Sequence, residues 1–246
     1  MRKAFYLLCG LGLLVPGLSW SQSAKKHSGV IYWHGDLDEK KVALTFDDGP
    51  NEPYTSQILK ILKDNNVKAT FFMVGKNVEF FPNTAKAVAE AGHVIGNHSY
   101  DHRNMVLEMN PHIRNEILRA QGAIQKATGQ HPTLFRNPYG AHDVLTMRQA
   151  EKLGYICIQW SVSSKDWERP GVERIISNVV RHVHNGGIIL MHDGNKISHG
   201  ADRSQTVGAL SEIIRRLQAE GYQFVTVPEL LNLSGVSKSN TATATP

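Results

Sequence analysis

The stretch from Lys41 to Pro50, KVALTFDDGP, decides the fold of this chain. Its first part is mostly apolar or β-branched, which predicts a strand, and the final Asp-Gly-Pro is a turn signal. Neighbouring side chains of a strand point to opposite faces, so Asp47 and Asp48 can reach one site only where the chain turns. Two close carboxylates repel each other unless a cation or a proton lies between them. The stretch alone therefore predicts a strand that ends either in an acidic pair sharing one site or in an ordinary solvated Asp-Gly-Pro turn.

Strand and helix patterns alternate about seven times along the chain, with short connections between them. Such alternation predicts a parallel sheet with right-handed crossovers, either closed as a barrel or open. In both architectures the active site lies at the carboxyl ends of the strands. The predicted strands cover residues 41–46, 69–74, 93–96, 133–135, 155–160, 187–191 and 223–225, and the predicted helices cover residues 54–64, 83–91, 111–128, 142–153, 172–183, 205–219 and 228–231.

His98 and His102 come directly after one of these predicted strands. Two imidazoles four residues apart can bind one metal ion, and an acidic third ligand would leave positions open for water. Asp48 is the obvious third ligand because it also follows a strand. A pair of surface histidines is the ordinary alternative in a chain with 12 histidines, but the shared position at strand ends favours a metal site.

Three more polar groups follow predicted strands. Arg136 can hold one carboxylate of the acidic pair ionised and oriented, and the turn at Tyr139 can present a backbone N–H to a reacting carbonyl. Asp166 follows the next strand, and His192 and Asp193 end the one after it as a pair of the exposed type. Each residue alone is more often a structural polar group, but five such groups at five strand ends indicate one active site.

Size and composition are those of one large globular domain. The chain has 246 residues, of which 41% are hydrophobic and 20% charged. Residues 1–21 combine a basic start, an apolar run and small residues before a polar stretch, which predicts a secretory signal peptide. The alternative is a membrane anchor, but the run is short for a spanning helix and rich in helix breakers. Residues 22–40 form a lead-in, and residues 233–246, rich in Ser, Thr and Ala, are expected to be disordered.

Charge and cysteine content exclude some classes of protein. Without residues 1–21 the formal net charge falls from +5 to +3, because Arg2 and Lys3 are lost. No cluster of Lys and Arg is interleaved with aromatic residues, so nucleic-acid binding is not expected. Cys157 is then the only cysteine, which rules out an internal disulfide and predicts a buried strand thiol.

In combination, TFDDGP, HSxxH and the three later groups resemble the motifs of the polysaccharide deacetylases, the NodB-homology proteins of carbohydrate esterase family four. The resemblance extends from about residue 41 to 231, within a predicted domain of residues 41–232. It implies an α/β fold, a distorted (β/α) barrel with fewer than eight complete repeats and here about seven parallel strands. It also implies one divalent metal ion, zinc first and cobalt or another first-row ion second, bound by Asp48, His98 and His102.

The same resemblance implies the catalytic roles. Asp47 would be the general base, and Arg136 would orient it. His192 would be the general acid, and Asp166 would tune it. The backbone N–H of Tyr139 would help to hold the oxyanion.

Substrate-binding residues are also implied by the resemblance. Trp167 and Leu190 would shape the pocket for the acetyl methyl group, together with Tyr139. The fourth motif departs from the family pattern, because Ser163 stands where an Asp is common. We expect this departure to affect substrate preference rather than activity.

These roles predict metal-dependent hydrolysis of N-acetyl groups from N-acetylglucosamine-type residues of a polysaccharide, with release of acetate. Export and a short catalytic chain favour peptidoglycan, ahead of chitin or chitooligosaccharides. An O-acetyl (xylan) esterase is a neighbouring alternative, and a non-catalytic glycan-binding protein is an alternative of another class. The expected partner is the polysaccharide, with no nucleic acid and no stable membrane insertion. The protein is expected to be a monomer in the periplasm or outside the cell.

Overall fold

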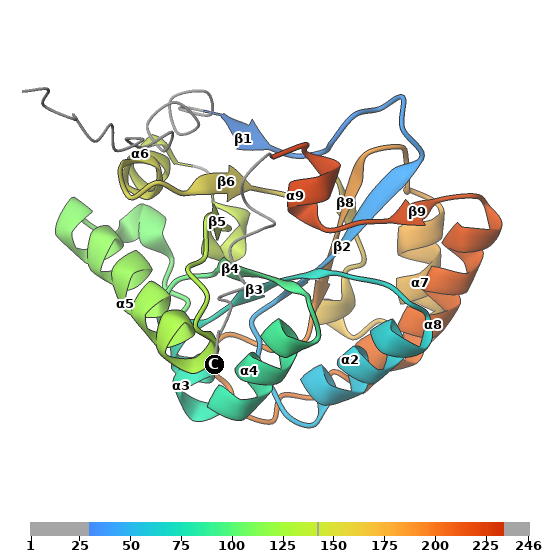
Figure 1. The fold of residues 1–246 in the computed structure, drawn as a ribbon, viewed down its shortest axis with the longest axis horizontal. Helices are drawn as coiled ribbons and strands as arrows, with labels where there is room; N and C mark the ends of the chain where they lie inside the picture. The colour runs from blue at the N-terminus through green and yellow to red at the C-terminus, as the bar shows by residue number, and fades with distance from the viewer. Residues whose placement is uncertain (1–29, 142, 234–246) are drawn as a thin grey trace, which may run out of the picture.

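A curled parallel sheet with helices on its outer side forms the molecule (Figure 1). The computed structural model describes residues 30–141 and 143–233, so the predicted signal peptide and the tail beyond Leu233 lie outside the described residues. Strand β2 (Lys41–Asp47) lies inside the order β1-β6-β5-β4-β3-β2-β8-β7, and β9 also pairs with β2. All these strand pairs are parallel. The predicted distorted (β/α) barrel is confirmed.

Two strands of the sheet, each of two residues, were not predicted. They are β1, inside the predicted lead-in, and β7. The other strands overlap the predicted ones. The nine strands of the described residues are β1 (Ile31–Tyr32), β2 (Lys41–Asp47), β3 (Thr70–Met73), β4 (Val94–Asn97), β5 (Leu134–Phe135), β6 (Ile156–Ile158), β7 (Val162–Ser163), β8 (Gly187–His192) and β9 (Gln223–Phe224).

The helices follow the predicted periodicity closely. Helix α2 (Tyr54–Asp64) has the predicted bounds, whereas the six-residue α3 (Gly75–Phe80) was not predicted. Helix α6 (Val144–Lys152) begins later than predicted because the Asp143 side chain caps it, accepting the Thr146 N–H at 2.8 Å. No helix of the described residues is long and apolar enough to cross a bilayer. The remaining helices are α4 (Pro82–Glu90), α5 (Asn110–Thr128), α7 (Val172–Val180), α8 (Ser204–Ala219) and α9 (Val227–Leu230).

The sheet closes on itself through the segment that follows β6. The predicted strand over 155–160 is wrong in its extent, because β6 ends at Ile158 and the chain then changes partner. The N–H of Ser161 donates to the Ile188 carbonyl, and β7 pairs with β8 instead of β5. On the lead-in side, His34 forms an isolated bridge with Gly187 at the start of β8. These two crossings join the edges of the sheet and make the barrel irregular.

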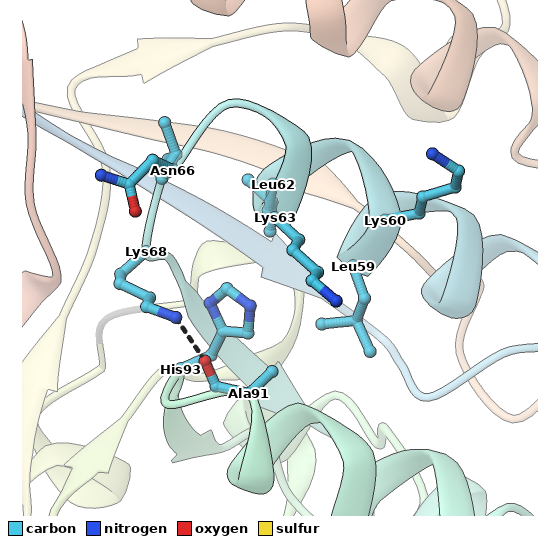
Figure 2. A pocket seen from close by; sticks show the side chains of 9 residues that line it. Leu59, Lys60, Leu62, Lys63, Asn66, Lys68, Ala91 and His93 are labelled. Atoms are coloured by element: carbon cyan, nitrogen blue, oxygen red, sulfur yellow. Dashed lines mark hydrogen bonds between the residues drawn. The ribbon is translucent and has the colours of Figure 1, made fainter.

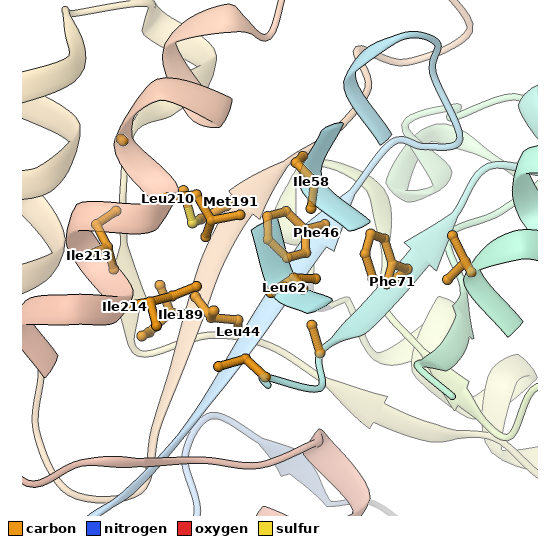
Figure 3. Packing of buried hydrophobic residues seen from close by; sticks show 14 of the residues in the cluster. Leu44, Phe46, Ile58, Leu62, Phe71, Ile189, Met191, Leu210, Ile213 and Ile214 are labelled. Atoms are coloured by element: carbon orange, nitrogen blue, oxygen red, sulfur yellow. The ribbon is translucent and has the colours of Figure 1, made fainter. Parts of the chain in front are cut away.

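Alternation along β2 separates the core from the site. Leu44 and Phe46 point outward and pack with residues of α2, β8 and α8 (Figure 3). Ala43, Thr45 and Asp47 therefore face the inside of the barrel, since successive side chains of a strand alternate. The face that carries Asp47 is thus fixed by burial of the opposite face.

Candidate active site

Three predicted metal ligands meet at the carboxyl ends of β2 and β4. Asp48 follows β2, His98 and His102 follow β4, and one ligand atom of each lies within 4.8 Å of the others. Asp48 Oδ1 is 3.4 Å from His98 Nε2 and 3.0 Å from His102 Nε2. All three side chains are buried. The structure therefore brings the predicted ligands together at the edge where the strand-end argument placed them.

Unusual backbone conformations aim these ligands at one point. Asp48, Ser99 and His102 have φ values of 74°, 67° and 57°, which are uncommon for residues other than glycine. Such conformations cluster at functional sites, where the surrounding contacts maintain them. His98 Nδ1 lies 2.7 Å from the Arg136 carbonyl, so Nδ1 carries the hydrogen and Nε2 presents its lone pair to the cluster.

The chemistry of the donor set fits a divalent cation. Asp48 Oδ1 is buried and has no hydrogen-bond partner among the described residues, whereas Oδ2 accepts the Lys196 N–H at 3.0 Å. One free carboxylate oxygen and two imidazole nitrogens suit a first-row ion and leave positions open. The three residues can therefore hold a divalent metal ion.

Arg136 holds the other member of the acidic pair. Its buried guanidinium donates to Asp47 Oδ1 at 2.7 Å, to Thr45 Oγ1 at 2.8 Å and to the Gln159 carbonyl at 3.0 Å. The second carboxylate oxygen of Asp47 lies 3.8 Å from His98 Nε2, facing the metal ligands. Arg136 thus gives Asp47 a cationic partner, and a divalent ion held by Asp48, His98 and His102 would give Asp48 a separate one, which would relieve the repulsion that the sequence implies.

His192, which is partly buried, and the buried Asp166 form a second pair beside Asp47. His192 Nδ1 lies 2.8 Å from Asp166 Oδ1, and Asp166 Oδ2 accepts from Thr206 Oγ1 and from the His192 N–H, both at 2.8 Å. Burial lowers the pKa of His192, but the Asp166 carboxylate, aided by Asp48 and Asp47, raises it to about 9. His192 is in register with Asp47 on the adjacent strand. A protonated imidazole therefore lies beside the acidic pair.

Aromatic side chains form the rim of this centre. Tyr139 is 55% exposed, and its ring centre lies 4.7 Å from that of His102. Trp167 is 42% exposed, and its ring centre lies 5.4 Å from that of His192. Leu190 is buried two residues before His192, on the same side of β8, in register with Ser163. All predicted substrate-binding residues thus lie at the same end of the barrel.

Sequence reasoning missed the asparagines that hold the loops of the site. Asn77 Nδ2 donates to the Asp48 carbonyl at 2.7 Å and to the Lys196 carbonyl at 2.6 Å. Asn51 Nδ2 donates to the Asp193 carbonyl at 3.0 Å and to the Ala201 carbonyl at 2.9 Å. Both follow strand ends, so the strand-end rule could have found them. Nothing in the local sequence signals Lys196.

The expectation of an exposed His-Asp pair is wrong for Asp193, which is buried. Its carboxyl is fully buried, and Thr55 Oγ1 donates to it at 2.7 Å. Burial raises the pKa of Asp193 to about 7, with a smaller contribution from Asp48. The residue packs against the backbone of the β2 turn, because a Cβ at Gly49 would overlap the Asp193 carboxylate.

Gly49→Ala is expected to destabilise the protein by roughly 1–3 kcal/mol, because overpacking at Asp193 forces the β2 turn to shift. The measurement is the free energy of unfolding from urea denaturation. Gly122→Ala is the matched control: Gly122 is exposed in α5, a Cβ there meets nothing within 4 Å, and a gain of roughly 0.5–1 kcal/mol is expected. Equal stability of the Gly49→Ala variant and the wild type would contradict the packing argument.

A hollow of about 530 Å³ lies at the opposite end of the strands (Figure 2). Its polar groups serve the fold: the Lys68 ammonium donates to the Ala91 carbonyl, and His93 Nδ1 accepts the Ala69 N–H at 3.1 Å. Burial, followed by the charge of Lys68, lowers the pKa of His93 to about 4. The hollow is separate from the centre at the carboxyl ends.

Comparisons with known proteins agree with the geometry. The family model described as polysaccharide deacetylase matches residues 34–158. A peptidoglycan-N-acetylglucosamine deacetylase of Bacillus cereus is 40% identical over 206 residues, covering 83% of this chain and 94% of that protein. A chitooligosaccharide deacetylase of Bradyrhizobium sp. is 36% identical over 205 residues, covering 80% of this chain and 94% of that protein. The crystal structure of a peptidoglycan N-acetylglucosamine deacetylase is similar with a TM-score of 0.78 and 35% identity, covering 88% of this chain and 97% of that one.

Proposed function

The chain belongs to the polysaccharide deacetylase family, and on that basis we propose that it removes N-acetyl groups from N-acetylglucosamine residues of peptidoglycan and releases acetate. The observation that supports this most is the joint placement of three units. The triad of Asp48, His98 and His102 lies beside the arginine-held Asp47, and His192 ends the adjacent strand. Amide hydrolysis needs a base for the water and an acid for the amine, and this centre offers both.

In the proposed mechanism one residue accepts a proton from water and another donates a proton to the leaving amine. A divalent ion in the triad, when bound, lowers the pKa of a water molecule and polarises the acetamide carbonyl. Asp47, oriented by Arg136 at 2.7 Å, accepts the proton of the attacking water. The backbone N–H of Tyr139 stabilises the oxyanion. His192, kept protonated by Asp166, gives its proton to the departing sugar amine, which is a poor leaving group without it.

We propose zinc as the native ion. Two imidazole nitrogens and one carboxylate oxygen, with at least one position left for water, are a ligand set that catalytic zinc sites use. Cobalt or another first-row ion would fit the same donors.

The names of the relatives support the choice of glycan. Proteins named peptidoglycan-N-acetylglucosamine deacetylase resemble this chain over most of their length, at 36–40% identity. A chitooligosaccharide deacetylase resembles it nearly as well, so chitooligosaccharides are the second candidate substrate. Hydrolysis of O-acetyl esters would use the same centre. A non-catalytic glycan-binding role is disfavoured, since every residue assigned to the metal, the base and the acid is present.

We also propose that residues 1–21 direct export, which would bring the enzyme to the cell wall. The same segment lies outside the described residues. The proposed location is the periplasm or the cell exterior.

The experiment that tests this function measures acetate release by the metal-loaded protein from peptidoglycan glycan strands, chitooligosaccharides and acetylated xylan. We expect the highest kcat/KM on peptidoglycan strands, loss of activity after chelation, and recovery on adding zinc. Mass spectrometry should show loss of acetyl groups from N-acetylglucosamine alone. Binding without acetate release from any of the three substrates would favour the non-catalytic alternative, and preferential release from xylan would favour the esterase.

A further inference from the structure

Lys196, in the loop after β8, has a backbone tied to the metal site. Its N–H donates to Asp48 Oδ2 at 3.0 Å, and its carbonyl accepts from Asn77 Nδ2 at 2.6 Å. The same Asn77 amide donates to the Asp48 carbonyl at 2.7 Å. Lys196 has a φ of 51°, a conformation that such tethering maintains. The position of its Cα is therefore set by the contacts that also position a metal ligand.

The side chain of Lys196 reaches from this backbone toward the opposite wall of the site. Its Nζ lies 5.4 Å from the centre of the Tyr139 ring, which in turn lies 4.7 Å from the His102 ring. A cation is attracted to an aromatic face, and this attraction restricts the side chain before any substrate binds. Both residues are exposed. The ammonium group thus lies at the mouth of the site, beside the residue proposed to hold the oxyanion.

The charge of Lys196 has no acidic partner among the residues that the structure describes. Lys76 and Arg103, the cations next to the loop that carries His102, both pair with Asp101, at 3.4 and 3.0 Å. Lys196 forms no ion pair with a carboxylate of residues 30–141 or 143–233. Its charge is therefore available to an anionic group of a bound glycan, and such pairs contribute to selectivity.

Candidate glycans differ in this chemistry. Chitin and chitooligosaccharides are neutral, whereas every second sugar of peptidoglycan carries a lactyl ether that ends in a carboxylate or in a peptide with carboxylates. We propose that Lys196 binds a carboxylate on the sugar next to the one that is deacetylated, and thereby selects acidic over neutral glycans. The inference rests on the proposed function, since it assigns a neighbouring subsite to the same centre.

The test compares one glycan in two charge states. Peptide-free peptidoglycan oligosaccharides are used with their lactyl carboxylates free or converted to methyl amides, and chitooligosaccharides serve as the neutral reference. Wild-type protein should show a kcat/KM about fivefold higher for the free acid than for the amide, the upper range for an exposed ion pair. Lys196→Gln should bring this ratio close to one, and Lys196→Arg should preserve it. High salt should reduce the ratio in the wild type and in Lys196→Arg, but not in Lys196→Gln, where no ion pair is left to screen.

Lys165→Gln is the matched control, because Lys165 is also exposed and left-handed, with a φ of 55°, on another loop of the same face. It should leave the ratio unchanged. The Lys196→Gln backbone keeps its N–H to Asp48, so its metal content should equal that of the wild type. An unchanged ratio in Lys196→Gln, or an equal loss on all three glycans, would overturn the inference while the proposed function stands. No acetate from any glycan with wild-type protein would instead overturn both.

Discussion

His98→Ala is expected to lose the bound metal and to lower kcat/KM by roughly 10³-fold or more. The ligand set among the described residues consists of one atom each from Asp48, His98 and His102. The contact of His98 Nδ1 with the Arg136 carbonyl orients the ring so that Nε2 faces the other two ligands. A bound divalent ion supplies several kcal/mol of transition-state stabilisation, and about 1.4 kcal/mol corresponds to a factor of ten. The measurements are metal content after dialysis and acetate release at saturating zinc.

The matched control for this variant is His112→Ala. His112 is an exposed histidine of α5 that contacts Glu108 at 3.0 Å, away from the metal ligands. Its removal should change neither metal content nor kcat/KM. If His98→Ala remained fully active in chelator-treated buffer, the assignment of the metal ligands would be wrong.

The position of the site was predictable because active sites of parallel α/β sheets lie at the carboxyl ends of the strands. The apolar pattern of residues 41–46 sets the direction of β2, and parallel strands bring their carboxyl ends to one edge. Asp48 and His98, 50 residues apart, were therefore expected at the same edge of the sheet, and the order β4-β3-β2 brings them together there. The roles of Asp47 and His192 came from resemblance, and their separate cationic and anionic partners became visible only in the structure.

The parts that sequence reasoning missed are those set by tertiary contacts. The change of partner after Ile158 depends on closure of the barrel, which no local pattern records. Asp193 was expected to be exposed because most aspartates are, yet it packs under the β2 turn. Lys196 has no motif, and its importance lies in a backbone contact with a residue 148 positions earlier. Loop residues of this kind are predicted poorly because their neighbours come from distant segments.

His192→Gln is expected to lower kcat by roughly 10²–10⁴-fold, the usual contribution of a general acid. Asp166→Asn should have a smaller effect whose size depends on pH. His192 acts as an acid only while protonated, and in the wild type its pKa is raised to about 9. Activity should therefore be kept below that pH and be lost as the pH rises through about 9.

In Asp166→Asn the burial of His192 remains and favours the neutral ring, while the main charge that opposes this effect is gone. The alkaline limb of the kcat/KM profile should move to lower pH by at least about one pH unit, since an opposite charge in contact shifts a pKa by that much or more. The activity of Asp166→Asn should be closer to that of the wild type at mildly acidic pH than at neutral pH. A variant that had lost its structure would not show this recovery. Thr206→Val provides the comparison, because it removes only one hydrogen bond to Asp166 and should move the limb less. An Asp166→Asn profile with an unmoved alkaline limb would show that His192 does not supply the proton to the amine.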